Sequence, residues 1–327
     1  MKAAVVAKGD AAPRWTEFAD PVAADDEVLV EISAAAVSNL ARATASGTHY
    51  SASGATESIA GVDGVGRFGD GSRAFCAFPR PPWGTVAQRV PIRLELLAPV
   101  PPDLDDVAAA ALGNPGMSSW VALLDRARLN PGETVLINGA TGAAGRLAIQ
   151  IAKHLGAHRA IVTGRDPSAF PQLEQLGADR CIDLSLPERD LVDAFYDAIN
   201  DRGVTVVLDY LWGASAQRLL EAIARRGPGP AAPRIRFVQI GAISGATIPL
   251  DGSVLRGSGV ELLGSGLRSV PLERIVARIG EMLDAAAQEH FAVDTVTRPM
   301  EDVATAWNED TGRKRLVLTL DDGGNAR

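Results

Sequence analysis

An apolar run that leads into closely spaced glycines, from Val135 to Gly145, has the residue types that bind a phosphate group. Thr134 to Ile137 is continuously apolar, as a buried parallel strand is, and the apolar spacing after Gly145 predicts a helix that ends near Gly156. Backbone N–H groups of the turn could approach a pyrophosphate at the positive end of that helix. The spacing departs from the standard Rossmann pattern, and a glycine-rich turn without a ligand is the alternative. The turn residues that we expect to contact a dinucleotide are Gly139, Thr141, Gly142, Ala143, Ala144 and Gly145.

The end of the next apolar run, Ala160 to Thr163, indicates which dinucleotide would bind. The run follows the glycines at about the distance of the second strand of a Rossmann unit. NAD-binding proteins usually place Asp or Glu there for the ribose 2′-hydroxyl, whereas this chain has Gly164 and Arg165. A small residue leaves room for a 2′-phosphate and a guanidinium can pair with it, so we expect NADPH as the cofactor. Asp166 is the alternative contact, either to the ribose or to Arg165.

Alternating strands and helices continue downstream of this unit. The pattern predicts strands over 180–183, 204–209 and 235–240, and helices over 191–199 and 214–225. Such alternation is typical of an α/β fold with a doubly wound parallel sheet, whose ligands lie beyond the carboxyl ends of the strands. Residues near those ends that we expect to line the nicotinamide end of the site are Tyr210, Gly241, Gly264 and Ser265.

The first third of the chain and its end are β-rich instead. The pattern predicts strands over 2–6, 27–32, 83–90 and 315–320, and the glycines of 61–71 predict turns. A helix is predicted over 271–289. A length of 327 residues suits two domains, so we expect a β-rich lobe beside the Rossmann lobe.

Four motifs resemble the medium-chain dehydrogenase/reductase superfamily: Gly61 to Arg67, Asn130 to Leu136, Gly139 to Gly142, and Gln150 to Lys153. Their order is that of the family, and within it the chain is similar to the zinc-independent quinone oxidoreductases. The resemblance implies a GroES-like catalytic domain formed by residues 1–112 and 268–327. It also implies a Rossmann nucleotide-binding domain over 113–267 and, frequently, a homodimer.

The departures from the zinc-dependent members concern the metal ligands. Those members read Gly-His-Glu where this chain has Gly61, Val62 and Asp63, and they use a cysteine where it has Ser38. Valine cannot ligate a metal, and the structural zinc lobe needs four cysteines whereas this chain has two, Cys76 and Cys181. We therefore expect no metal, and two buried thiols.

Without a metal, another group must stabilise the developing negative charge of a reduction. The chain has no Tyr-x-x-x-Lys pair of the kind that short-chain reductases use, which disfavours simple alcohol oxidation. Hydride transfer to a quinone or an α,β-unsaturated carbonyl acceptor asks less, because the conjugated acceptor spreads the charge itself. We expect this activity, with an NADP(H)-binding sensor or structural protein of little turnover as the alternative.

The hydrogen-bond donors for such an acceptor are sought in the segment 36–50. The family's usual tyrosine, near Ala43, is absent, so the catalytic candidates are Asn39, His49 and Tyr50. The alternative for Asn39 is a helix cap, and for His49 and Tyr50 it is a surface loop. Asn114 is predicted to begin the helix that leads into the second domain. Together with partly buried tryptophans and a surface arginine, it gives the candidate substrate pocket of Ser38, Trp83, Asn114, Trp212 and Arg268.

Composition limits the partners. A net charge of −8 argues against nucleic acid and anionic membranes, and we expect a small-molecule substrate. The sequence has no uninterrupted apolar run of about eighteen residues and no signal peptide, so the expected location is cytoplasmic.

Overall fold

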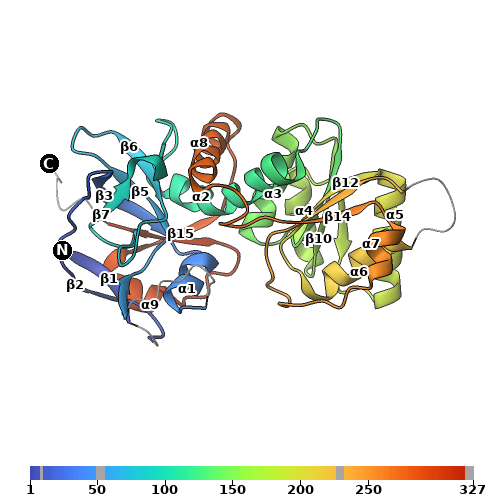
Figure 1. Ribbon diagram of the computed structural model, residues 1–327, viewed down its shortest axis with the longest axis horizontal. Coiled ribbons are helices and arrows are strands. Elements are labelled where there is room, and N and C mark those ends of the chain that lie inside the picture. The colour runs from blue at the N-terminus through green and yellow to red at the C-terminus, as the bar shows by residue number, and fades with distance from the viewer. Residues whose placement is uncertain (8–9, 49–55, 226–231, 321–327) are drawn as a thin grey trace. The chain divides into compact units, whose positions relative to one another are not determined.

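The computed structural model describes residues 1–7, 10–48, 56–225 and 232–320 of the chain. It divides into two compact units (Figure 1). The first contains Met1–Met117 and Leu272–Arg327, and the second contains Ser118–Pro271. The chain passes from the first unit to the second within helix α2, Asp106–Val121, and returns at the start of helix α8, Leu272–Glu289.

The second unit is built on a six-stranded parallel sheet in the order β11-β10-β9-β12-β13-β14. The first strand of the unit, β9, is central, and the strand order reverses between β9 and β12. That reversal is the switch point at which doubly wound sheets bind their ligands. The strands are β9 Thr134–Asn138, β10 Arg159–Gly164, β11 Arg180–Asp183, β12 Val204–Asp209, β13 Ile235–Gln239 and β14 Val260–Gly264.

Helices cover both faces of this sheet, which explains why its central strands are mostly apolar and buried (Figure 1). On one face lie α3, Ala143–His154, and α4, Phe170–Gln175. On the other lie α5, Glu188–Arg202, α6, Gly213–Ala224, and α7, Gly252–Gly257, which pack over Phe195 and Phe237. The predicted α/β class with a Rossmann-type sheet beside a β-rich domain is confirmed.

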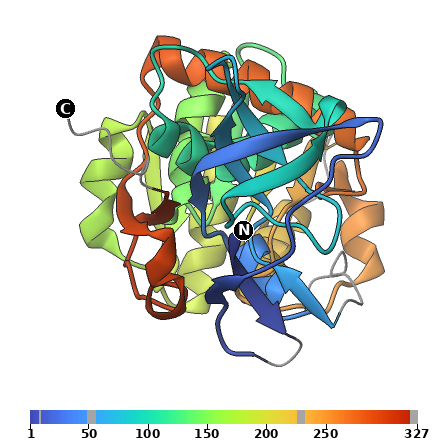
Figure 2. The ribbon, with the colours of Figure 1, turned by 90° about the vertical axis from the view of Figure 1, so that its left-hand side faces the viewer.

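The first unit is dominated by strands, drawn in blue and teal in Figure 2. Its larger sheet follows the order β15-β16-β3-β5-β6-β8, and β7 also pairs with β3. A smaller sheet has the order β2-β1-β4. The long strand β3 therefore pairs with β5, β7 and β16 and is the hub of the unit.

The strands of the first unit are β1 Lys2–Ala7, β2 Arg14–Glu17, β3 Glu27–Ala36, β4 Glu57–Ile59, β5 Asp63–Arg67, β6 Arg73–Ala77, β7 Arg89–Arg93, β8 Leu97–Pro99, β15 Thr295–Pro299 and β16 Arg315–Thr319. Its short helices are α1 Asn39–Ala45 and α9 Val303–Ala306. Single turns of 3-10 helix occur at Leu94–Leu96, Pro167–Ala169 and Met300–Asp302, the second of these in the other unit.

One expectation for the first unit was right in part and another was wrong. The glycine-rich stretch 61–71 has its predicted turn at 68–71, but it also contains the strand β5, in which Gly64 and Gly66 lie against the backbone of β3. The predicted strand over 83–90 is mostly irregular, with a single bridge from Ala87 to Ala3, and the regular strand there is β7. The aromatic and branched residues of 83–90 predicted a strand, but regular pairing with β3 begins only at Arg89.

The segment 106–127, α2 and the π-helical turn Ala122–Ala127 that continues it, is long and apolar enough to cross a membrane by length and composition. Of its most apolar window, 72% is buried inside the structure. Core helices meet the same criteria, so this observation alone does not indicate a membrane span.

We predict that Gly66→Ala destabilises the protein by about 2 kcal/mol, because overpacking a close contact costs roughly this much. A Cβ atom at Gly66 would lie 2.5 Å from both the Glu31 carbonyl oxygen and the Val30 Cγ1 atom of β3. Gly69→Ala is the control, since no atom lies within 4 Å of its Cβ position. Urea unfolding would measure both, and equal stabilities of the two variants would contradict the close-approach explanation.

Candidate functional site

Three buried polar side chains lie at the carboxyl ends of β9, β10 and β12, beside the switch point of the sheet. They are Asn138, Thr163 and Asp209, each 0% exposed. The Asn138 Nδ2 donates to the Asp209 Oδ1 at 2.8 Å, and the Thr163 hydroxyl donates to the Asn138 Oδ1 at 2.8 Å. Buried polar groups are stable only when paired, and here each satisfies the next.

This network holds the two turns on either side of the switch point. The Gly139 N–H donates to the Thr163 hydroxyl at 2.9 Å. The Asp209 carboxylate accepts the backbone N–H groups of Leu211 and Trp212, both at 3.1 Å. Burial raises the pKa of Asp209, although the Asn138 amide and these two N–H groups favour its ionised form. The turn after β9 and the turn after β12 are therefore fixed by one set of bonds.

The glycine turn is packed on its inner side and open at Gly142. Gly139 has a φ of +98°, and a Cβ atom there would lie 2.8 Å from the Leu211 side chain. A Cβ atom at Gly145 would lie 2.5 Å from the Gly139 carbonyl oxygen. Around the Cβ position of Gly142, which caps α3 without a side chain, no atom lies within 4 Å. The first N–H groups of α3, including those of Ala143 and Ala144, are thus placed where an anion could reach them.

The residues after β10 are arranged around Gly164. A Cβ atom at Gly164 would lie 2.5 Å from the Thr141 Cγ2, so a larger residue would collide with the glycine turn. Arg165 is exposed, and its Nη2 makes a long hydrogen bond of 3.5 Å to the Ser244 hydroxyl. The Asp166 carboxylate accepts the backbone N–H of Ser168 at 3.0 Å and its hydroxyl at 2.6 Å, which closes a local turn.

The other predicted contacts of this unit lie at the ends of β12, β13 and β14. The Tyr210 hydroxyl bonds to the Ser119 hydroxyl at 2.7 Å, and burial raises its pKa to about 12. Gly241 lies against the Tyr210 carbonyl oxygen, which a Cβ atom there would approach to 2.6 Å. The Gly264 carbonyl accepts from Arg126, and the Ser265 N–H donates to the Gln239 carbonyl.

Two further substrate-pocket candidates of the second unit differ in their surroundings. The Trp212 ring makes an edge-to-face contact with Phe237, with ring centroids 6.4 Å apart, and packs partly buried against the core under α6. Arg268 is exposed.

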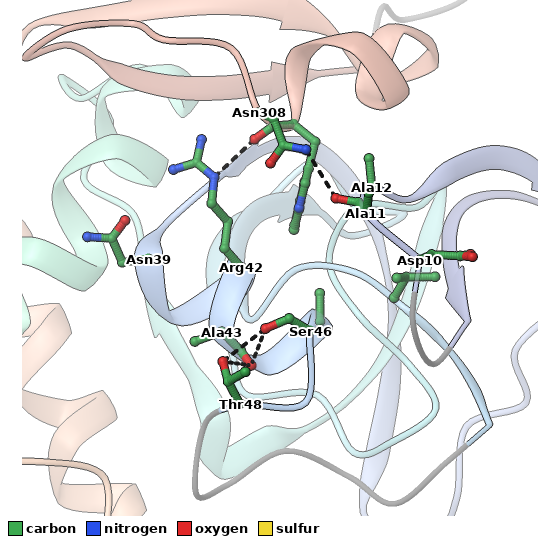
Figure 3. Close-up of a pocket in the computed structure, with 12 residues that line it drawn as sticks. Asp10, Ala11, Ala12, Asn39, Arg42, Ala43, Ser46, Thr48 and Asn308 are labelled. Carbon is green, nitrogen blue, oxygen red and sulfur yellow. Dashed lines mark hydrogen bonds between the residues drawn. The ribbon is translucent and has the colours of Figure 1, made fainter. Parts of the chain in front are cut away.

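The remaining candidates lie in the first unit, where α1 begins. The Ser38 hydroxyl is buried and accepts the Ala41 N–H at 2.9 Å, so Ser38, and not Asn39, is the cap of this helix. Asn39 is exposed and lines a pocket of about 350 Å³ together with Arg42 and residues of the 307–308 segment (Figure 3). His49 and Tyr50 lie outside the described residues.

Trp83 and Asn114 have structural surroundings. The Trp83 ring contacts Phe18 edge-on at 5.8 Å and packs on the small cluster formed by β1 and β4. Asn114 was expected to begin a helix, but α2 begins at Asp106, so Asn114 lies within the helix just before Pro115. The residues before Asn114 are apolar and already helical. The Asn-Pro-Gly sequence is typical of a helix start, and it therefore led to a predicted start that is too late.

Two charged side chains with buried, unpartnered atoms in the first unit were missed by sequence reasoning. Asp63, 1% exposed, lies on β5, and Arg315 lies on β16. Within the described part of the chain, both Asp63 carboxylate oxygens and the Arg315 Nε and Nη2 are buried without a hydrogen-bond partner. Burial raises the pKa of Asp63 to about 7, and the Arg315 charge opposes this rise. An acidic residue inside an otherwise apolar and glycine-rich run was the only available signal.

Comparison with known proteins locates the chain among oxidoreductases. Residues 143–288 match the family model described as zinc-binding dehydrogenase. A quinone oxidoreductase from Thermus thermophilus, whose structure was also solved with NADPH, is 26% identical, covers 98% of this chain and 100% of its own, and has a TM-score of 0.78. A probable NADPH-dependent quinone reductase from Emericella nidulans is 30% identical over 66% of this chain and 62% of its own length.

By these matches the chain is similar to the medium-chain dehydrogenase/reductase family. It also matches a Mycobacterium tuberculosis phenolphthiocerol/phthiocerol polyketide synthase subunit, at 33% identity over 48% of this chain. The chain spans only 7% of that much longer relative.

The residues at the positions where zinc-dependent relatives bind their metal are poor in donor atoms. Val62 carries no donor atom, and the Ser38 hydroxyl already accepts a backbone hydrogen bond. Burial raises the pKa of the Cys76 thiol to about 12 and that of Cys181 to about 11. Over residues 1–7, 10–48, 56–225 and 232–320, no three His, Cys, Asp or Glu side chains form a group that could hold a metal ion.

We predict that Asp63→Asn flattens the pH dependence of stability between about pH 4 and pH 7. The pKa of Asp63 is about 7 in the folded protein against a model value of 3.8, so the folded state holds a proton that the unfolded state has released. Its stabilising contribution is full below the unfolded pKa and is lost as the pH rises through the folded one. Urea unfolding across this range would measure the slope, with the exposed Asp103→Asn as control. Equal slopes in wild type and Asp63→Asn would refute the assignment.

Proposed function

We propose that the protein is an NADPH-dependent, metal-independent oxidoreductase that transfers hydride to a quinone or an α,β-unsaturated carbonyl acceptor. The observation that carries the proposal is the pairing of the open glycine turn with Gly164 and Arg165 after the next strand. That arrangement provides for a pyrophosphate and for a 2′-phosphate, and an acidic residue that would select NADH is missing from this position.

The residues of the second unit fit the dinucleotide in separate roles. The N–H groups at the start of α3, behind Gly142, would bind the pyrophosphate, and Arg165 would pair with the 2′-phosphate. Gly164 keeps the space beside Thr141 clear. NADPH, when bound, supplies the hydride. The family relatives from Thermus and Emericella support this cofactor by their described NADPH complex and activity.

The acceptor must be one that needs no Lewis acid. The residues at the family's zinc positions do not fit a metal, since Val62 has no donor and Ser38 caps α1. A conjugated acceptor spreads its developing charge over its own atoms, so a neutral hydrogen-bond donor is sufficient. Asn39, the exposed first residue of α1, is the described residue that we assign to this role, beside the candidates His49 and Tyr50.

We predict that Arg165→Ala lowers the preference for NADPH over NADH by about 10- to 100-fold, because one charge-assisted hydrogen-bonded pair contributes roughly 1.5–3 kcal/mol. The change should fall mainly on the KM for NADPH, since the 2′-phosphate is bound equally before and during hydride transfer. Oxidation of NADPH and NADH, followed by absorbance with a panel of quinones and enones, measures both constants.

Arg159→Ala is the matched control, because Arg159 begins the same strand that Arg165 follows. It should leave the cofactor preference unchanged. Tight NADPH binding with no acceptor consumed would overturn the reductase proposal in favour of a cofactor sensor, and an unchanged preference in Arg165→Ala would overturn the phosphate assignment.

A further inference from the structure

The pocket beside α1 is lined by one arginine, Arg42. Among the described residues that line the pocket, Arg42 and Asp10 are the only charged ones. The Arg42 side chain reaches from α1 to the 307–308 segment, where its Nε–H donates to the Trp307 carbonyl oxygen at 3.0 Å (Figure 3). In the described chain, this bond leaves both terminal guanidinium nitrogens without a hydrogen-bond or ion-pair partner.

Neighbouring charges do not neutralise Arg42. Asp10 accepts the Ala7 N–H at 3.1 Å and pairs with Arg14 at 3.7 Å, and Figure 3 shows it apart from the Arg42 guanidinium. Arg315 adds a second positive charge nearby: burial lowers the pKa of Arg315, and the Arg42 charge lowers it further. Asp63 opposes Arg315 and does not reach the pocket lining. Arg315 does not line the pocket either, so Arg42 is the one positive charge in the described lining and Asp10, which pairs with Arg14, is the one negative charge.

The Arg42 guanidinium keeps its charge in the pocket. Burial lowers the pKa of Arg42, yet an arginine remains protonated under all ordinary conditions. Its two terminal nitrogens could pair with an anion that enters the pocket. A carboxylate matches the planar fork of a guanidinium, with two parallel hydrogen bonds.

We propose that this pocket binds a carboxylate of the acceptor, so that the substrate is a quinone or an α,β-unsaturated carbonyl compound that carries one. This inference rests on the proposed function and narrows its substrate class. Asn39 lies one turn before Arg42 on α1 and offers an amide donor, while Val6 and Ala43 provide an apolar wall for the hydrocarbon part. A volume of about 350 Å³ suits a small substrate.

Binding of a non-reactive analogue tests the pocket without turnover. Levulinate (4-oxopentanoate) and its neutral counterpart 2-pentanone would be titrated calorimetrically into the full chain as wild type, Arg42→Gln and Arg42→Lys. We expect the levulinate affinity to fall about 10- to 100-fold in Arg42→Gln and less in Arg42→Lys, which keeps the charge but not the fork. Arg89→Gln, which removes an exposed arginine paired with Asp20, is the matched control and should bind like wild type. Equal levulinate affinity in wild type and Arg42→Gln would overturn the inference.

A kinetic comparison then tests the substrate class. The acceptors are (E)-4-oxopent-2-enoate and the neutral (E)-pent-3-en-2-one, and the readout is the ratio of their kcat/KM values with NADPH. We expect wild type to prefer the carboxylate, and this preference to fall about 10- to 100-fold in Arg42→Gln but not in Arg89→Gln. Turnover of both acceptors with a ratio that Arg42→Gln does not change would overturn the inference and leave the reductase proposal standing. Arg42-dependent levulinate binding with neither acceptor reduced would support the anion pocket and count against the reductase proposal.

Discussion

The buried hydrogen-bond network of Asn138, Thr163 and Asp209 is the constraint on which the nucleotide-binding geometry depends. Each of these side chains ends one of three adjacent parallel strands, and none is exposed to water. A buried amide, hydroxyl or carboxylate left unpaired costs about 1–3 kcal/mol, so the three strand ends must keep their register for all of them to be satisfied. The backbone N–H groups of Gly139, Leu211 and Trp212 also donate to this network. The turns after β9 and β12 therefore take their shape from it.

The first unit carries a different kind of polar burial. The Arg315 charge opposes the rise in the pKa of Asp63, yet within the described residues four polar atoms of the two side chains lack hydrogen bonds. Arg42, close to Arg315, brings the same positive charge to the surface of a pocket. Incomplete satisfaction of this kind is uncommon in interiors and is found where a protein binds or reacts. The paired network of Asn138, Thr163 and Asp209 thus lies in the second unit, and the unpartnered polar atoms of Asp63 and Arg315 lie in the first.

Much of the second unit could be predicted from the sequence because its signals are local. Buried parallel strands are apolar runs, and β11 and β12 were predicted with the bounds that the structure has. The glycine turn and Gly156, which has a φ of +88° after α3, follow from the same local rules. The features that escaped depend on distant partners. Gly64 and Gly66 pack so close to β3 that a Cβ atom would lie 2.8 Å and 2.5 Å from its carbonyl oxygens, and their sequence neighbours do not reveal that partner strand. The capping role of Ser38 depends on the path of the chain before α1, which the sequence does not give either. Asp63 and Arg315 influence each other although they lie about 250 positions apart in the sequence, and no spacing rule connects them.

The central claim is that the polar network shapes the turn that binds the dinucleotide, and the most direct test is the affinity for NADPH of Thr163→Val beside Thr163→Ser. Serine keeps a hydroxyl for both the Gly139 N–H and the Asn138 amide oxygen, whereas valine keeps the shape and removes both bonds. Fluorescence titration of NADPH into the two variants, with urea unfolding to confirm that each is folded, should give a Kd about tenfold or more weaker for valine and near wild type for serine. A folded Thr163→Val protein that binds NADPH as tightly as wild type would contradict the account.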